Sequence, residues 1–308
     1  MKIVAPDYYG EFECIKGACR HSCCAGWEID IDPESRERYR KMTGTLGGKL
    51  AENIVDGPDG AHFRLGAGER CPFLQADGLC EMIIALGEDS LCQICADHPR
   101  FRNFFSDSTE VGLGLCCEAA GRLILSRKEP VSFIALEDDG DRGDAYEDEC
   151  ELREIRGELI KLAQDRSMSV ERRVEQICDA MDIALPEIDY ARWAEFLTGL
   201  ERMDDSWADR LAALQKAEDA AFEGWEAEFE QLLVYLIWRH LPGALDDGDV
   251  EGRAAFCALM WRIMRRMFAV SGGGFEELVE IARLYSSEIE YSDENIGEIL
   301  AELHRNGV

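Results

Sequence analysis

The second half of the chain has apolar residues at helical spacing almost from end to end. Apolar side chains that recur every three or four positions indicate amphipathic helices. Pro242-Gly243 ends one such pattern, Ser271–Gly274 separates two others, and Asp246–Asp249 and Ser292-Asp293 offer N-cap residues. The pattern predicts helices over 151–166, 170–183, 187–202, 206–221, 225–241, 249–270, 274–288 and 292–305.

The first half has shorter and less regular patterns. Trp27–Ile31 alternates apolar and polar residues, which predicts a short strand. Asp32-Pro33-Glu34 has an N-cap residue, a proline at the first helical position and an early acid, and it predicts a helix through Met42. Residues 43–69 are rich in glycine and are expected to be irregular, and a short helix is predicted over 81–87.

The composition changes near residue 126, where cysteines and glycines become sparse and the long helical patterns begin. The stretch 136–150, LEDDGDRGDAYEDEC, is acidic and reads as an exposed linker. The predicted fold is therefore mainly α. A cysteine-rich metal-binding domain with short helices and little strand covers 1–125, an acidic linker covers 126–150, and an all-helical domain covers 151–308.

The formal net charge of −30 is unevenly distributed. Residues 1–125 carry 13 Lys/Arg against 20 Asp/Glu, and residues 126–308 carry 20 against 43. Nucleic acid is not expected as a partner, because binding to phosphates needs a basic surface. An acidic surface can attract a lysine-rich protein, although its simplest role is to keep the chain in solution.

Membrane insertion is not expected either, since no apolar run approaches the roughly 20 residues that cross a bilayer. The start, MKIVAPDYYGEFEC, lacks the apolar core of a secretory signal, so we expect a cytoplasmic protein with reduced thiols. That compartment favours metal binding over a disulfide framework for the cysteines, whose odd total would also leave one thiol unpaired.

Ten of the thirteen cysteines fall within the first 117 residues at short intervals. Zinc sites and four-iron clusters both take four ligands, so ten thiols exceed one site of either kind. His98 is a further candidate ligand, with a structural role beside Pro99-Arg100 as the favoured alternative. Cys178 and Cys257 lie on apolar helix patterns and are expected in the core. The ten clustered thiols are Cys14, Cys19, Cys23, Cys24, Cys71, Cys80, Cys92, Cys95, Cys116 and Cys117.

Several segments resemble the flagellin lysine-N-methylase family, which is related to a wider group of zinc- or iron-chelating domains. Four of them contain cysteines: 12–32, 71–82 (CPFLQADGLCEM), 86–100 (LGEDSLCQICADHPR) and 113–125 (LGLCCEAAGRLIL). Two softer matches lie in the tail, YLIWRHLPGALDDGD at 235–249 and EIEYSDENIGEIL at 288–300. The family often has proline after its last cysteine, where this chain has Cys117. The ligand role is therefore carried to Cys116 and not to Cys117.

The resemblance implies methyl transfer from S-adenosylmethionine to lysine side chains of flagellin or another lysine-bearing protein. It also implies an iron–sulfur cluster, expected as 4Fe–4S with zinc as the alternative. The implied metal ligands are Cys14, Cys19, Cys23, Cys24, Cys71, Cys80, Cys92, Cys95 and Cys116.

The residues themselves leave the chemistry open. No strand–helix alternation with a glycine-rich turn indicates a Rossmann methyltransferase, so the cofactor pocket and the catalytic residues are unknown at this level. Two other functions fit the cysteines equally well: a non-enzymatic zinc- or iron-binding module, and an iron–sulfur redox protein.

Overall fold

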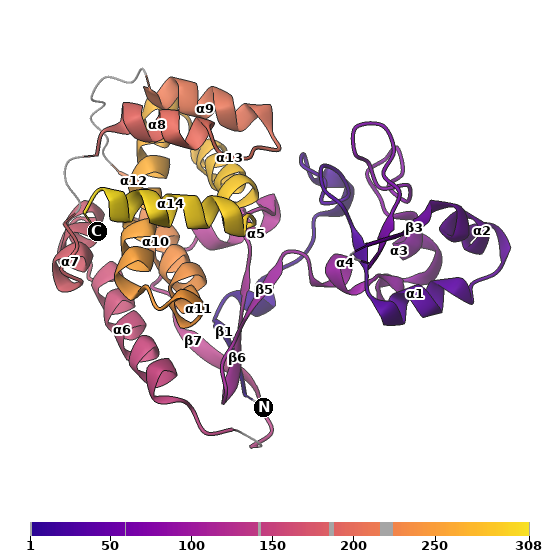
Figure 1. The fold of residues 1–308 in the computed structure, drawn as a ribbon, viewed down its shortest axis with the longest axis horizontal. Coiled ribbons are helices and arrows are strands. Elements are labelled where there is room, and N and C mark those ends of the chain that lie inside the picture. Colours follow the sequence, from indigo (N-terminus) through magenta and orange to yellow (C-terminus); the bar gives the residue numbers. More distant parts are fainter. Residues whose placement is uncertain (1, 59, 141–142, 185–187, 216–223, 308) are drawn as a thin grey trace. The chain divides into compact units, whose positions relative to one another are not determined.

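The computed structural model describes residues 2–58, 60–140, 143–184, 188–215 and 224–307, which fall into two compact units (Figure 1). Glu13–Phe101 forms the first, here called the cysteine unit. Met1–Phe12 and Arg102–Val308 form the second, here called the helical unit. The sequence analysis predicted domain boundaries at residues 125 and 150 instead. The boundaries differ because strands from three separated segments of the chain pair in one sheet of the helical unit.

The cysteine unit combines short helices with a three-stranded sheet in the order β2-β4-β3. The sheet is antiparallel, and Asp30 pairs with His62 while Ile54 pairs with Phe63. The helix α2 and the strands β3 and β4 lie in the stretch predicted to be irregular, so that prediction was wrong there. The elements are η2 (Lys16–Ala18), β2 (Asp30–Ile31), α1 (Pro33–Arg40), α2 (Gly44–Asn53), β3 (Ile54–Gly57), β4 (Gly60–Phe63), α3 (Glu81–Leu86), η3 (Glu88–Ser90) and α4 (Gln93–Asp97).

One carboxylate connects two helices of this unit. Asp32 caps α1 by accepting a hydrogen bond from Ser35 N at 2.8 Å, and its other oxygen accepts one from Gln93 N at 2.8 Å. The second bond falls at the first residue of α4, where amide groups lack partners within the helix. Asp32 therefore holds the start of α4, which carries Cys95, next to the start of α1.

The helical unit contains a four-stranded sheet in the order β5-β6-β1-β7. β1 (Lys2–Pro6) runs parallel to β6 (Ser108–Leu113) and antiparallel to β7 (Phe133–Asp138), and β5 (Arg100–Phe104) lies at the edge. β7 therefore occupies part of the segment predicted to be an acidic linker. Its exposed side chains explain why no core strand was predicted there.

Helices make up most of the helical unit, and each of the eight predicted helical segments contains an observed helix. Residues 216–221, at the end of one predicted segment, and residue 187, at the start of another, lie outside the described residues. The elements are η1 (Tyr9–Glu11), α5 (Glu118–Leu125), α6 (Glu147–Ala163), α7 (Val170–Ala180), α8 (Tyr190–Thr198), α9 (Asp205–Gln215), α10 (Glu226–His240), η4 (Leu241–Gly243), α11 (Ala244–Asp247), α12 (Val250–Ser271), α13 (Phe275–Tyr285), the π-helix η5 (Ser286–Glu290) and α14 (Asp293–Arg305).

The core of this unit is built around α10 and α12, which are apolar on nearly all sides. A helix of that kind is stable only where other helices cover it. α10 packs on α5, α6 and α12, and α12 packs in turn on α7, α9, α13 and α14 (Figure 1). Polar His240 at the end of α10 is consequently buried like its apolar neighbours. Among the described residues, no helix has the length and apolar character to span a membrane.

Candidate functional site

Five of the nine predicted metal ligands gather in the core of the cysteine unit. Cys71 and Cys92 are buried members of this core, and Cys24, Cys80 and Cys95 pack against it. Separate elements position them: Cys80 is the N-cap of α3, Cys92 is the N-cap of α4, and Cys71 N donates a hydrogen bond of 2.8 Å to Cys24 O. These five residues are called the cysteine core below.

The thiols of the cysteine core influence one another. A hydrogen bond with Cys23 lowers the pKa of Cys24 to about 7, and a hydrogen bond with Cys95 lowers the pKa of Cys92. Burial raises the pKa of Cys71 to about 12, with further increases from the charges of Cys24, Cys80 and Cys92. Thiolates so close together repel one another, and a bound cation relieves that repulsion.

The other four predicted ligands do not belong to this core, although Cys23 is hydrogen-bonded to Cys24 at its edge. Cys14 accepts a hydrogen bond from Lys16 N at 3.4 Å and the Cys19 thiol donates one to His21 O at 3.3 Å, both local contacts, while Cys23 is exposed. Cys116 belongs to the helical unit, where it is hydrogen-bonded to Tyr291. Among the described residues, no group of three or more His, Cys, Asp or Glu side chains is placed to hold a metal ion. A metal site formed by all nine cysteines therefore stays a prediction.

The cysteines that were not predicted to bind metal, and His98, lie in the following surroundings. Cys178 and Cys257 are buried in α7 and α12, as predicted, whereas Cys150 is exposed. Cys117 is the N-cap of α5. The ring of His98 stacks on Trp27 with 6.5 Å between ring centroids, which supports its structural role.

A second candidate site is a cavity of 320 Å³ within the helical unit. Its wall comes from the end of β5, the end of α10, α11, the start of α12, η5 and the start of α14. The volume lies at the lower end of the range for small-molecule sites. The lining residues are Arg102, Asn103, Phe104, Phe105, Arg239, His240, Pro242, Gly243, Leu245, Asp246, Arg253, Glu290, Asp293 and Ile296.

Glu290 is the most deeply buried carboxylate of this wall, with no exposed side-chain surface. The Tyr235 hydroxyl lies 2.8 and 2.7 Å from the two carboxylate oxygens and donates its hydrogen bond to them. Arg239 Nε lies 3.4 Å from the carboxylate. Glu290 ends the π-helix η5, a rare element that is frequent at functional sites. These contacts fix the orientation of the carboxylate.

The partners of Glu290 also determine its charge. Burial alone raises the pKa of Glu290, but the hydrogen bond with His240 and the charge of Arg239 outweigh burial and lower it. Burial lowers the pKa of His240, which lies 3.7 Å from Glu290 and 2.8 Å from the Tyr285 hydroxyl. The cavity wall thus contains an ionised carboxylate beside a neutral imidazole at neutral pH.

Sequence reasoning did not single out Glu290, because the chain contains 63 Asp and Glu residues without a distinguishing motif. The available signal was indirect. Tyr235, Arg239 and His240 lie in the segment 235–249 and Glu290 lies in the segment 288–300, which are the two tail segments of the family resemblance. The structure brings these two segments together at one cavity.

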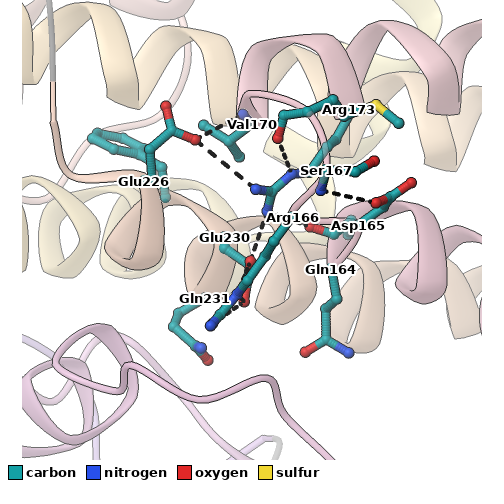
Figure 2. A network of polar contacts seen from close by, with 12 residues as sticks. Gln164, Asp165, Arg166, Ser167, Val170, Arg173, Glu226, Glu230 and Gln231 are labelled. Carbon is teal, nitrogen blue, oxygen red and sulfur yellow. Dashed lines mark hydrogen bonds and ion pairs between the residues drawn. The ribbon is translucent and has the colours of Figure 1, made fainter.

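A third polar cluster lies at a cavity of 450 Å³ on α7 and α10 (Figure 2). Buried Glu230 accepts hydrogen bonds from Arg173 at 2.6 Å and from Arg166 at 2.8 and 2.9 Å. Glu226 accepts one from Val170 N, at the start of α7. Glu230 pairs with both guanidinium groups, and backbone carbonyls accept further hydrogen bonds from them, so the cluster is interpreted as structural.

A model of the FliB lysine N-methylase C-terminal domain matches residues 144–308, more than half of the chain. The chain belongs to the FliB lysine N-methylase family. Most of the cavity wall, from Arg239 to Ile296, lies within the matched segment, and the cysteine core lies outside it. The family match therefore includes Tyr235, Arg239, His240 and Glu290.

Individual relatives of this family match a shorter part of the chain. The Lysine-N-methylase of Salmonella typhimurium (strain LT2) is 28% identical over 142 residues, which cover 43% of this chain and 35% of the relative. The same values hold for the Lysine-N-methylase of Salmonella choleraesuis (strain SC-B67). The Flagellar biosynthetic protein FliU of Salmonella muenchen is 26% identical over 139 residues, which cover 43% of this chain and 82% of FliU.

The chain thus spans about a third of the length of the two methylases that it matches. No solved structure matches it.

Proposed function

We propose that this chain is a protein-lysine N-methyltransferase that uses S-adenosylmethionine and acts on flagellin. The observation that carries the proposal is the cavity with buried Glu290 and His240, most of whose wall lies in the segment that matches the FliB lysine N-methylase family. The names of the relatives, Lysine-N-methylase and Flagellar biosynthetic protein FliU, support lysine as the acceptor and flagellin as its source.

The reaction makes two demands on the protein. The acceptor amine has an ordinary pKa near 10.4, so it must lose a proton before it can act as a nucleophile. The amine must also be aligned with the methyl group, which S-adenosylmethionine supplies when it is bound. His240 answers the first demand, because its imidazole is kept neutral by burial and lines the cavity. We assign the imidazole of His240 as the acceptor of the amine proton.

Glu290 and Tyr285 position this imidazole. Glu290 is held ionised and stabilises the positive charge that His240 gains with a proton. The Tyr285 hydroxyl, 2.8 Å from Nε2, is itself buried and limits the rotation of the ring. A neutral base beside a fixed negative charge is the arrangement that general-base catalysis uses.

The cysteine core is proposed to hold the iron–sulfur cluster. The type of donor fits, since cysteine thiolates are the usual ligands of such clusters. Cys24, Cys71, Cys80, Cys92 and Cys95 supply five thiols in one core, one more than a 4Fe–4S cluster needs. The hydrogen bond between Cys92 and Cys95, which brings two of these thiols together, supports the proposal.

Methyl transfer is tested with the full chain, purified anaerobically, unmodified flagellin and methyl-labelled S-adenosylmethionine. We expect label on flagellin lysines, located by mass spectrometry of peptides. His240→Gln should lower the rate by about 100-fold, the lower end of what a general base contributes. His304→Gln is the matched control, because His304 is half-exposed and lies outside the cavity. No transfer by iron-loaded protein would overturn the proposed activity, and equal rates for the two variants would overturn the role of His240.

A further inference from the structure

The charged groups around the 320 Å³ cavity include both signs in equal number. Arg102, Arg239 and Arg253 contribute guanidinium groups, and Asp246, Glu290 and Asp293 contribute carboxylates. Phe104, which is 74% exposed, adds an aromatic ring to the wall. The cavity is therefore suited to a small molecule that carries positive and negative charge close together.

The guanidinium of Arg253 is held in place. Its Nε and one terminal nitrogen lie 2.8 and 2.7 Å from Asp247 Oδ2. It also lies against Gly243, where an added Cβ would come within 2.5 Å of the guanidinium carbon. Gly243 thus leaves the space that brings this guanidinium to the wall. A guanidinium fixed in this way is a good partner for a carboxylate, because little conformational entropy is lost on binding.

Asp246 and Asp293 stand out among the carboxylates. Both are exposed, and within the described part of the chain neither side chain has a hydrogen bond or an ion pair. Glu290, in contrast, is already engaged by Tyr235 and Arg239. Asp246 and Asp293 can therefore take up a cationic group of a ligand without breaking a contact of the protein.

A lysine side chain does not account for this set of charges. It brings one ammonium group on a slender apolar stem, and so offers no anionic partner to the three guanidinium groups of the wall. An α-amino acid group brings an ammonium and a carboxylate on one carbon, and so matches carboxylates and guanidinium groups together. The charge pattern thus favours an amino-acid zwitterion as the occupant.

We propose that this cavity binds the amino-acid end of S-adenosylmethionine. Arg253 would hold the α-carboxylate, Asp246 and Asp293 would hold the α-ammonium group, and the Phe104 ring would lie near the sulfonium, since aromatic faces attract cations. The inference rests on the proposed function and specifies its cofactor site. It places the methyl donor in the same cavity as His240, the proposed base.

Binding calorimetry tests the assignment without any methyl transfer. The full chain, purified anaerobically, is titrated with S-adenosylhomocysteine, which has no methyl group to give, and with 5′-methylthioadenosine, which lacks the amino-acid end. Asp246→Asn and Asp293→Asn remove the two exposed charges one at a time. Glu294→Gln is the matched control, because Glu294 is also exposed, follows Asp293 in α14 and lies outside the cavity.

We expect each aspartate substitution to weaken binding of S-adenosylhomocysteine by about tenfold, the loss typical of a hydrogen bond to a charged group. Binding of 5′-methylthioadenosine should not change, and Glu294→Gln should affect neither ligand. Unchanged affinity for S-adenosylhomocysteine, or an equal loss for both ligands, would overturn the inference and leave the proposed activity standing. A wild-type chain that binds neither ligand would overturn both the inference and the dependence on S-adenosylmethionine. The methyl transfer assay with flagellin tests the proposed activity itself.

Discussion

His98 illustrates how the surroundings of one residue decide between two roles. From the sequence it was either a metal ligand or a structural side chain. In the structure it stacks on Trp27, and burial together with the charge of Arg100 lowers its pKa to about 4. The imidazole is therefore neutral at neutral pH in the folded cysteine unit.

The lowered pKa predicts a pH dependence of stability. Between about pH 6.5 and pH 4 the unfolded chain binds a proton at His98 that the folded chain does not bind. The free energy of unfolding should therefore fall as the pH drops through this window, by up to about 3 kcal/mol, and this contribution is constant above and below it. NMR titration of the ring should show a midpoint near 4. His98→Gln is the non-titrating control, and a midpoint near 6.5 would contradict the prediction.

Glu290 shows what the sequence could not reveal at the scale of residues. Its neighbours in the chain resemble those of many other carboxylates, and only the fold places Tyr235, Arg239 and His240 around it. The cysteines, in contrast, could be identified as candidate ligands from the sequence, because their short spacing is visible along the chain. Even so, spacing alone did not separate the five thiols that share a core from Cys14, Cys19, Cys23 and Cys116.

At the scale of elements, the long helices of the second half were predictable, whereas α2 and the larger sheet were not. The helices α6 to α14, apart from the short α11, follow from apolar periodicity and from local caps. Asp249, for example, accepts a hydrogen bond from Gly252 N, and Ser292 accepts one from Asn295 N. β1 is stabilised by β6 and β7, more than one hundred residues away in the chain. Such pairing leaves no local signal, and the exposed strand β7 also lacks a buried face.

Glu230 connects three segments of the helical unit through its ion pairs. Arg166 precedes α7, Arg173 belongs to α7, and Glu230 lies on α10 (Figure 2). The side chains of Arg173 and Glu230 are 4% and 1% exposed, so neither charge can be hydrated if its partner is removed.

Replacing Glu230 should therefore be costly. We expect Glu230→Gln to lower the free energy of unfolding by about 3–5 kcal/mol, the cost of an uncompensated buried charge. Glu175→Gln removes an exposed partner of Arg172 on the same helix and should change stability by less than about 1 kcal/mol. Urea denaturation followed by circular dichroism measures both variants. Similar losses for the two would show that burial of the pair is unimportant.

At the scale of the whole molecule, the chain has one compact unit inserted between the first strand and the remainder of another. A sequence boundary near 126 separated cysteine-rich from helical composition, but β1 and β6 join the sheet of the helical unit. The composition thus indicated the chemistry of each segment, but it did not indicate which strands pair in one sheet. The cysteine unit retains a core of its own, in which the five thiols pack with Ile29, Tyr39 and Phe73.

Because each unit has its own core, we expect the loss of metal to destabilise the cysteine unit and not the helical unit. A bound metal stabilises the part of the chain whose side chains form its site. Cys92→Ser should therefore remove iron and acid-labile sulfide from the anaerobically purified protein. It should also accelerate amide hydrogen exchange within Glu13–Phe101, while the exchange of α10 and α12 stays slow. Cys178→Ser is the control, because Cys178 packs in α7 and should leave the metal content unchanged. A colourless wild-type protein with stoichiometric zinc would exclude the cluster. Metal loss from Cys178→Ser but not from Cys92→Ser would overturn the assignment of the metal site to the cysteine core.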